Sequence, residues 1–296
     1  MSDRDARIGF VGAGRVAAGL GLALSRRGYR VALVFSRSRS SAERLASLIS
    51  GCAVAASAQA LVDACDLVFL TVPDDALADA TAAIAWRPGI AAVHCSGAVD
   101  LGVLAPAARS GASVGGFHPL QMFADPEVAV QGLPRCAIAV EAGEPLAARL
   151  VELAHALGAR PLQVPAGGRA AYHAGAHYAG AFAAALLREA VRIWAAIGIP
   201  ENDAVPALLG LLRGSTDAME HNGLARAMAG SVSRGDTGTV RRHIEALRTL
   251  DPAFADFYSR LALRTVPLAL ERGSITPEKA EELKRVLNAA LDPKTG

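Results

Sequence analysis

A histidine stands between a diglycine and a proline in the stretch GGFHPLQMF, residues 115–123. The residues before it are small and β-leaning, which predicts a strand over 112–118. Pro119 has no backbone N–H and a fixed φ, so we expect the strand to end about where His118 begins. An imidazole titrates near neutral pH, so a histidine fixed there is either a structural group or a group that transfers protons.

A hydroxyl group stands at a similar place, because VHCSGA puts Ser96 at the end of a strand predicted over 90–96. In open α/β sheets, ligands bind beyond the carboxyl ends of the strands. We expect Ser96 to orient the His118 ring, which would then transfer a proton to or from the ligand. His118 and Ser96 are therefore the predicted catalytic residues, and the nearby Gln121 is a candidate for substrate binding.

A glycine-rich loop near the N-terminus has the spacing of a dinucleotide site. IGFVGAGRVAAGLG places Gly12, Gly14 and Ala17 in G-x-G-x-x-A order between a predicted strand and a predicted helix. Gly12 permits the tight turn, Gly14 lets the backbone approach a pyrophosphate, and Ala17 lets the helix pack closely. The alternative is a purely structural turn. The predicted cofactor-binding residues here are Gly12, Ala13, Gly14, Arg15, Val16 and Ala17.

Two further loops bear on the cofactor. After the second predicted strand, an NAD enzyme usually has Asp or Glu, whereas this chain has Ser36, Arg37 and Ser38. A guanidinium and hydroxyls favour the 2′-phosphate of NADP(H), although a solvated loop with a helix cap has the same composition. In LTVPDDAL, Val72 and Pro73 are predicted to pass the nicotinamide-side ribose, with Asp74 as the cap of the next helix. Pro73 is alternatively a simple turn residue.

The elements that must position these groups follow a βα alternation in the first half of the chain. Continuous apolar strands between helices predict a parallel sheet that is covered on both faces. After residues 164–168 the pattern becomes helical. The predicted fold class is α/β, with an N-terminal Rossmann doubly wound sheet over 1–165 and a C-terminal all-helical domain over 166–296. The predicted strands cover 6–12, 29–35, 66–72, 90–96, 112–118 and 135–140, and a further helix and strand cover 145–164. The predicted helices cover 15–27, 40–49, 57–64, 74–85, 169–197, 203–229, 238–249, 252–272 and 277–291, with Asp251 and Thr276 as N-caps.

Composition narrows the class of protein. The chain has 296 residues, is 52% hydrophobic and carries a net charge of +2 without a run of basic residues. This argues against nucleic acid and membrane surfaces as partners. The four cysteines are far apart, the charged N-terminus has no signal-peptide pattern, and no apolar stretch predicts a membrane span. We therefore expect a cytoplasmic protein.

Polar residues on the predicted helix 169–197 are further candidates. Arg169, His173 and His177 recur at i, i+4 and i+8, so they share one face. That face either contacts substrate in a cleft between the domains or is polar packing. A metal site needs further ligands and no HExxH motif is present, so none is predicted. In the second half, Arg234, Asp236 and His243 either form a helix cap and ion pair or line the site of a partner subunit.

Several of these motifs together resemble a known family. GFHPLQMF and HCSGA, after GAGRVAAGLG and TVPDDAL, are similar to Rossmann-like proteins whose C-terminal helical domain has no known function. AGSVSRGDTGTVRRHIEAL, residues 229–247, resembles that family's Arg-Gly-Asp segment, and YHAGAH, residues 172–177, resembles its Tyr-His segment. The resemblance extends over nearly the whole chain.

The family lies within the 6-phosphogluconate-dehydrogenase-like group, near ketopantoate and pyrroline-5-carboxylate reductases. The resemblance implies an NADP-binding domain and a homodimer formed through the C-terminal helices. The apolar faces of residues 169–197 also favour burial by a second subunit. The Ser96 and His118 arrangement resembles prephenate dehydrogenases, in which a serine and a histidine act on the substrate hydroxyl.

The chain departs from the family pattern at Gly180-Ala181, where the family has Ser-Asn, and at Ala229-Gly230-Ser231, where it has Thr-Gly-Pro. These changes imply a different substrate or weaker catalysis. We expect an NADP(H)-dependent oxidoreductase for a small polar carbonyl, imine or hydroxy acid. The alternative is a catalytically weak NADP(H)-binding sensor or regulatory protein.

Overall fold

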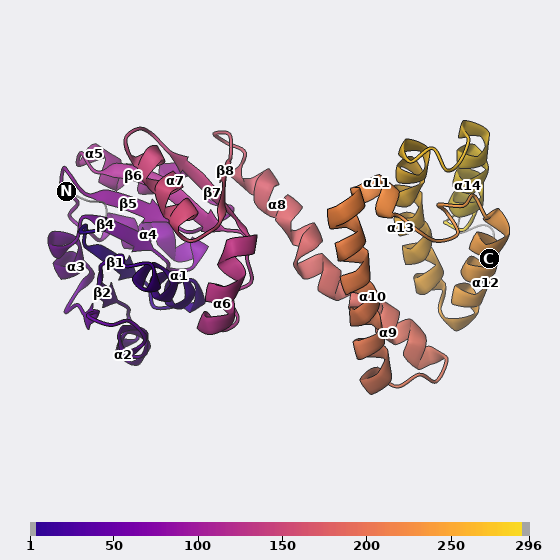
Figure 1. Cartoon of the computed structure of the whole chain (residues 1–296), viewed down its shortest axis with the longest axis horizontal. Coiled ribbons are helices and arrows are strands. Elements are labelled where there is room, and N and C mark those ends of the chain that lie inside the picture. The colour runs from indigo at the N-terminus through magenta and orange to yellow at the C-terminus, as the bar shows by residue number, and fades with distance from the viewer. Residues whose placement is uncertain (1–3, 292–296) are drawn as a thin grey trace. The chain divides into compact units, whose positions relative to one another are not determined.

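The computed structural model describes residues 4–291. The chain divides into two compact units, Met1–Gly180 and Ala181–Gly296. Figure 1 shows the first unit as a sheet with helices and the second as helices alone. The division lies later than the boundary predicted at residue 165, so the helix that carries Arg169 and His173 belongs to the first unit. No helix in residues 4–291 is long and apolar enough to cross a membrane.

The first unit contains an eight-stranded sheet in the order β3-β2-β1-β4-β5-β6-β7-β8. All neighbouring strands are parallel except β6 and β7, which pair antiparallel and so depart from the predicted all-parallel arrangement. The doubly wound sheet is confirmed. The strands are β1 (Ile8–Val11), β2 (Val31–Phe35), β3 (Ala53–Val54), β4 (Leu67–Leu70), β5 (Ala91–His94), β6 (Ser113–Pro119), β7 (Ala137–Ala142) and β8 (Arg160–Gln163).

Strand β6 ends at Pro119, one residue beyond the predicted end, but the prediction that Pro119 stops the ladder is wrong. Pro119 lies in the strand opposite Ile138, and the Leu120 N–H donates to the Ala137 carbonyl at 2.8 Å. In an antiparallel ladder the N–H groups of successive residues point to alternate sides. The nitrogen of Pro119 therefore faces the side of β5, which has already ended at His94. A proline there removes no ladder hydrogen bond.

Helices cover both faces of the sheet. Adjacent residues of a strand point to opposite faces and accordingly belong to different core clusters. Phe10 and Phe69 stack at 5.3 Å in one cluster, whereas Val11 and Leu70 lie in the other. The helices of this unit are α1 (Arg15–Arg26), α2 (Arg39–Leu48), α3 (Ala58–Ala64), α4 (Leu77–Ala82), α5 (Ala105–Arg109), α6 (Pro126–Gly132), α7 (Leu146–Ala156) and α8 (Arg169–Ala179). Short 3-10 turns cover η1 (Asp74–Ala76), η2 (Leu101–Leu104) and η3 (Leu133–Arg135).

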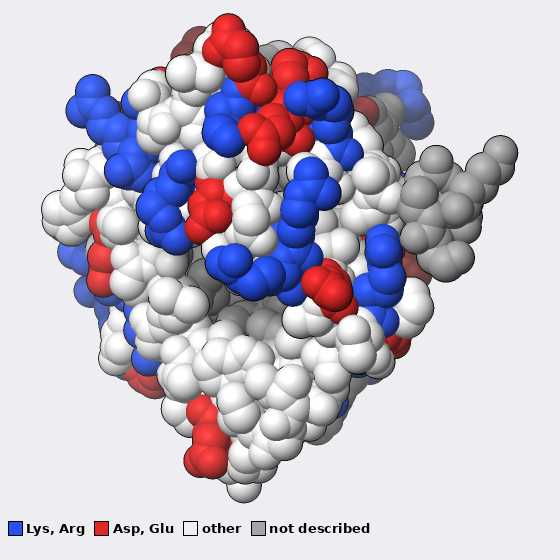
Figure 2. Space-filling view, turned by 90° about the vertical axis from the view of Figure 1, so that its right-hand side faces the viewer, with Lys and Arg blue, Asp and Glu red and all other residues white. Residues whose placement is uncertain are grey.

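The described part of the second unit is helical. Its helices are α9 (Ala181–Ala196), α10 (Glu201–Asn222), α11 (Leu224–Ala227), α12 (Thr237–Leu250), α13 (Pro252–Glu271) and α14 (Pro277–Ala289). Val240, Val266 and Leu283 form its main core. On the face in Figure 2, acidic and basic side chains are interspersed. Ion pairs of this unit include Lys279–Glu282 at 2.7 Å.

The sequence predicted two helix N-caps correctly but missed two breaks within helices. The predicted N-caps at Asp251 and Thr276 are confirmed, since their side chains accept from the N–H groups of Ala253 and Lys279. The continuous helices predicted over 169–197 and 203–229 are wrong. The first is interrupted at Gly180, with φ −103° and ψ −94°, and the second at Gly223, with φ +79°. Both breaks use the backbone freedom of glycine.

Candidate active site

A cavity of about 730 Å³ lies at the carboxyl ends of β1, β2 and β4. Its volume is in the range of ligand pockets. Most of the residues predicted to bind the cofactor line this cavity; Ala17, Ser38 and Asp74 do not. Those that do are Gly12, Ala13, Gly14, Arg15, Val16, Ser36, Arg37, Val72 and Pro73.

The two glycines of the loop have different roles. Gly12 has φ +108°, and a Cβ there would lie 2.6 Å from the backbone carbonyl of Thr71. The loop after β1 therefore requires glycine where it passes the loop after β4. The Thr71 hydroxyl joins the two loops by donating to the Gly12 carbonyl at 2.9 Å. A Cβ on Gly14 would approach only the Thr71 carbonyl oxygen, at 4.0 Å. The space beside Gly14 is thus open toward the cavity.

Helix α1 begins at the cavity with its N-terminal N–H groups uncapped by a side chain. Gly14 is its N-cap, with extended backbone, and the first turn contains no acidic residue. Such a terminus carries partial positive charge and free donors, which suit a pyrophosphate. Ala17 is fully buried, in keeping with its predicted packing role.

The loop after β2 contains both a helix cap and an exposed arginine, the two alternatives that its composition allows. Ser38 is the N-cap of α2 and accepts from the Ser41 N–H at 3.3 Å. Arg37 is exposed at the cavity wall, and no ion pair of it is found among residues 4–291. Asp74 does not cap the following turn, which begins after Pro73, so that prediction is wrong. Arg37 is thus a cation of this loop that is available for a phosphate.

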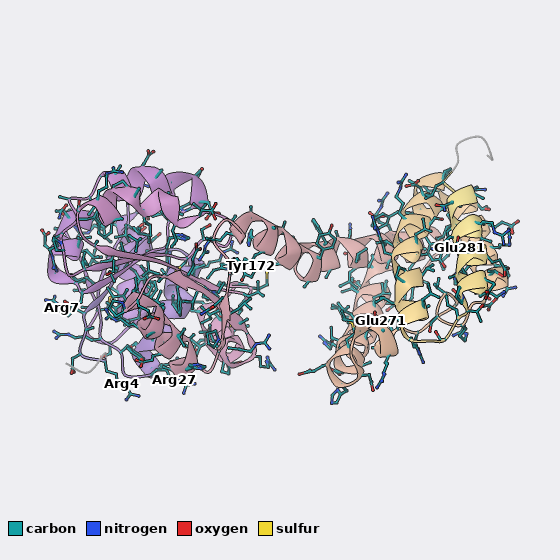
Figure 3. All side chains as sticks on the ribbon, turned by 90° about the horizontal axis from the view of Figure 1, so that it is seen from above. Arg4, Arg7, Arg27, Tyr172, Glu271 and Glu281 are labelled. Atoms are coloured by element: carbon teal, nitrogen blue, oxygen red, sulfur yellow. The ribbon has the colours of Figure 1, made fainter. Side chains whose placement is uncertain are left out.

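The predicted hydrogen bond between Ser96 and His118 is not formed. The Ser96 hydroxyl oxygen accepts from the N–H groups of Ala98 at 3.2 Å and Val99 at 3.0 Å, so it caps the turn after β5. His118 Nδ1 instead lies 3.0 Å from the hydroxyl of Tyr172 on α8. Figure 3 labels Tyr172 near the start of this helix. Tyr172 was missed as a site residue, although it belongs to the YHAGAH segment.

The polar face of α8 meets the same strand ends. Arg169 is fully buried, and its Nε donates to Glu141 Oε2 on β7 at 2.5 Å. Its Nη1 donates to the Ser96 carbonyl at 2.7 Å. The ring of His173 is edge-on to His118 at 5.4 Å, and the ring of His177 lies 4.7 Å from His173. The predicted common face is therefore observed, with Glu141 as an unpredicted partner.

Other candidates have structural partners. The Gln121 side-chain amide donates to the Ala129 carbonyl at 2.7 Å, which ties the end of β6 to α6 rather than pointing to a substrate. Asp236 caps α12 by accepting from the Thr239 N–H at 2.9 Å. His243 Nδ1 lies 3.0 Å from the Tyr258 hydroxyl. The predicted helix cap is thus observed at Asp236, whereas no ion pair of Arg234, Asp236 or His243 is found among residues 4–291.

The surroundings of His118 favour a neutral imidazole. Burial, together with the nearby His173 and Arg169, lowers the pKa of His118 to about 4. Burial likewise lowers the pKa of His94 to about 4, with contributions from Arg169 and His118. The Ser96 N–H donates to His94 Nδ1 at 3.2 Å. At neutral pH, His118 is therefore a proton acceptor.

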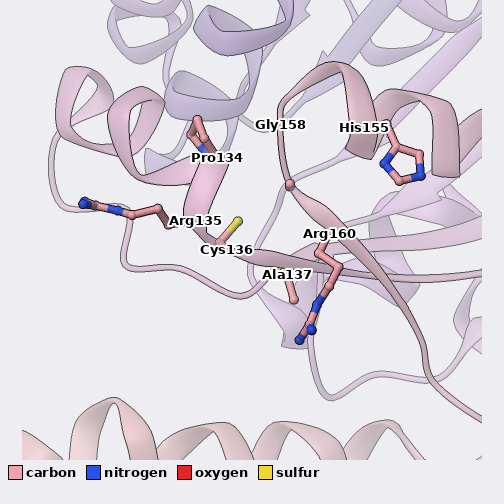
Figure 4. A pocket seen from close by; sticks show the side chains of 8 residues that line it. Pro134, Arg135, Cys136, Ala137, His155, Gly158 and Arg160 are labelled. Atoms are coloured by element: carbon pink, nitrogen blue, oxygen red, sulfur yellow. The ribbon is translucent and has the colours of Figure 1, made fainter. Parts of the chain in front are cut away.

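A second hollow of about 430 Å³ lies beside the start of β7. Figure 4 shows His155, Arg160 and Cys136 around it. None of the predicted site residues lines it. Residues 4–291 contain no cluster of three or more His, Cys, Asp or Glu that would hold a metal ion. The four cysteines are free, and burial raises the pKa of the Cys95 thiol to about 12.

Two domain families match the chain. Residues 2–119 match a Rossmann-like domain, and residues 136–265 match a domain of unknown function, DUF2520. The chain thus combines these two domains, and the resemblance inferred from the sequence is confirmed. No curated protein sequence matches the chain.

Solved structures share this fold. A protein of Thermotoga maritima has a TM-score of 0.73 at 22% identity, covering 90% of this chain and 99% of its own. The 1-pyrroline-5-carboxylate reductase of Streptococcus pyogenes has a TM-score of 0.61 at 14% identity, covering 97% and 98%. A reductive aminase of Aspergillus terreus, solved with NADPH4, cyclohexanone and allyl amine, has a TM-score of 0.59 at 19% identity, covering 98% and 95%. At these identities the similarity establishes the fold.

Proposed function

We propose that the protein is an NADP(H)-dependent oxidoreductase for a small polar carbonyl, imine or hydroxy acid. The observation that carries the proposal is the cavity on the Gly12 and Gly14 loop, with Arg37 at its wall and no acidic residue at the end of β2. The open α1 N-terminus suits the pyrophosphate, and Arg37 suits a 2′-phosphate. Two of the similar structures are named as a reductase and a reductive aminase, which agrees with this class.

The order of the strands supports a place for His118 near a bound cofactor. Strands β4, β5 and β6 are neighbours in the sheet, so their ends are about 4.8 Å apart from one strand to the next. Val72 and Pro73 follow β4, and His118 lies at the end of β6. Val72 and Pro73 would contact the nicotinamide side of the cofactor, and His118 would face a small substrate bound beside it.

NADP(H), when bound, supplies or accepts the hydride at the substrate carbon. During oxidation of an alcohol, His118 Nε2 accepts the hydroxyl proton while the C–H electron pair leaves with the hydride. Tyr172 contacts the opposite ring nitrogen, Nδ1, at 3.0 Å and so leaves Nε2 for the substrate. In the tautomer that carries its proton on Nδ1, Nε2 is the proton acceptor. In the direction of reduction, the same imidazole delivers the proton, and its low pKa makes it a strong acid once it is protonated.

The proposal is tested by following NADPH absorbance with a panel of 2-keto acids and cyclic imines, and NADP+ reduction with hydroxy acids. Turnover with one of them supports the enzyme. NADPH binding without turnover across the panel supports the alternative, a sensor, which the Gly180-Ala181 departure favours. Absence of NADPH binding rejects both.

We further propose that the second unit forms a homodimer through α9 and α10. Of the 16 residues in α9, Val191 is the one that is buried. Leu186 is 39%, Ile197 60% and Leu211 69% exposed, which is apolar surface that a second copy would cover. Light scattering is expected to give a dimer that Leu211→Glu weakens. A wild-type monomer at micromolar concentration contradicts this proposal.

A further inference from the structure

We propose that Arg169 is the positioning residue of the proton-transferring pair, because its buried guanidinium seats α8 on the sheet and thereby holds Tyr172 against His118. The catalytic consequence rests on the proposed function, whereas the seating is a property of the first unit alone.

The contacts of Arg169 connect the first turn of α8 to three neighbouring strands. Its Nε donates to Glu141 on β7, and its Nη1 donates to the carbonyl of Ser96, just after β5. Its Nη2 packs against Gly116 on β6, between the other two strands. Tyr172 and His173 follow three and four residues later and so lie above Arg169 on the same helix face. The place where Arg169 is anchored therefore decides where both side chains meet His118.

Two glycines make room for the side chains with which α8 packs against the sheet. A Cβ on Gly116 would overlap Arg169 Nη2 and lie 2.6 Å from its Cζ. A Cβ on Gly97 would overlap His173 Nδ1 and lie 2.8 Å from His118 Cε1. Neither glycine has the positive φ that would explain glycine by backbone conformation. Both are explained by the side chains that cross them, so the second glycine of the diglycine before His118 makes room for Arg169.

A purely stabilising ion pair does not account for this arrangement. Arg169 Nη2 is buried and has no hydrogen-bond partner among the described residues, and the same is true of His173 Nδ1 and His94 Nε2. Buried donors without partners oppose folding, and an apolar side chain of similar volume would fill the space at lower cost. What the guanidinium adds is a fixed charge and a fixed geometry beside three imidazoles.

The charged and titratable groups around His118 come from each element packed against it. They are His94 on β5, Glu141 on β7, and Arg169, Tyr172 and His173 on α8. Arg169 and His173 oppose protonation of His118, in addition to burial. Loss of Arg169 is therefore expected to loosen the Tyr172 contact and to ease protonation of His118 together.

The experiment is a histidine titration by NMR on the full-length protein with labelled imidazole nitrogens, so it needs no substrate. The variants are Arg169→Met, Arg169→Lys and Gly116→Ala, with Arg160→Met as the matched control at an exposed arginine. His118→Gln assigns the resonance, and Tyr172→Phe gives the signature of a lost hydroxyl contact.

We expect Arg169→Met and Gly116→Ala to shift the His118 titration upward by one pKa unit or more and to reproduce the Nδ1 signature of Tyr172→Phe. Arg169→Lys keeps the positive charge but loses the planar guanidinium and its two directed hydrogen bonds. We therefore expect its His118 titration to be closer to the wild type than its Nδ1 signature is. Arg160→Met should match the wild type.

The proposal is overturned if Arg169→Met or Gly116→Ala shows the same His118 titration and the same Nδ1 signature as the wild type. If Arg169→Met does not fold, Gly116→Ala and Arg169→Lys decide by the same readout. NADPH affinity is measured on the same samples. A wild-type protein that binds no NADPH refutes the proposed function, while the titration still decides the role of Arg169.

Discussion

The two ends of the candidate site lie on one edge of one sheet but are built differently. At β1, β2 and β4, the cavity is made by backbone and by residues that are adjacent in sequence. At β5 and β6, the group around His118 is made by side chains from four segments, joined by the Arg169 and Tyr172 contacts. The first end is suited to hold a ligand by its backbone donors, and the second to place one imidazole.

The largest effect is expected at the second end. His118→Ala should lower turnover by roughly a hundredfold or more, as is typical when a general acid–base group is removed. NADPH affinity should hardly change, because the ring is not part of the cavity wall. Steady-state kinetics and calorimetry measure the two quantities, with His155→Ala as a control at an exposed histidine. Lower thermal stability with an unchanged rate per folded molecule would make His118 a structural residue.

The reverse pattern is expected at the first end. Gly14→Ala should keep the fold, because its Cβ meets only an oxygen at 4.0 Å, and it should weaken NADPH binding about tenfold, the effect of about 1.4 kcal/mol. Gly12→Ala should instead destabilise the protein, because of its φ of +108° and the overlap with Thr71. Calorimetry and thermal unfolding separate the two. Wild-type NADPH affinity in Gly14→Ala would contradict the assignment of the cavity.

A smaller difference is expected between the two hydroxyl groups near His118. Tyr172→Phe removes one hydrogen bond to the ring and should lower turnover by about fivefold, the effect of about 1 kcal/mol. Ser96→Ala should cost about 1 kcal/mol of stability by loss of its turn cap, with little effect on turnover. A double-mutant cycle should couple His118 to Tyr172 and not to Ser96. The opposite coupling would restore the pairing inferred from the sequence.

The last of these predictions concerns pH and stability, not turnover. His94 and His118 have pKa values lowered to about 4 in the folded state, so the unfolded chain binds more protons between about pH 4 and 6.5. The free energy of unfolding should therefore fall as the pH drops through this window and change little from these groups above it. Urea unfolding at pH 7 and pH 5 measures this, and His94→Asn should reduce the difference. Equal stability of the wild type at both pH values would contradict the neutral state of these histidines.

The contrast between a site made by backbone and a site made by side chains also explains which parts could be predicted from the sequence. The Gly12 and Gly14 loop could be interpreted because backbone geometry is encoded in neighbouring residues. His118 could be found from its place at a strand end, but its partner could not. The Ser96 hydroxyl is occupied by N–H groups two and three residues away, a local competition that strand order does not reveal. Tyr172, which lies 54 residues from His118, depends on how α8 packs.

Other misassignments have the same origin. Pro119 was expected to stop the hydrogen-bond ladder, but Leu120 still donates to β7. The effect of a missing N–H depends on which neighbouring strand it faces, and that requires the antiparallel pairing with β7. Gly180 and Gly223 lie within helical patterns whose apolar periodicity continues across them. The caps at Asp251 and Thr276 were predictable because a cap is made within its own turn.

The central claim is that the cavity at β1, β2 and β4 selects NADP(H) through Arg37. Calorimetric titration of the full-length protein with NADPH and with NADH tests it most directly, together with Arg37→Asp. We expect NADPH to bind at least about tenfold more tightly, since a charge-assisted phosphate contact contributes about 1.5–3 kcal/mol, and Arg37→Asp to abolish or reverse the preference. Equal affinities for the two nucleotides in the wild type, or a preference that Arg37→Asp leaves unchanged, would contradict the account.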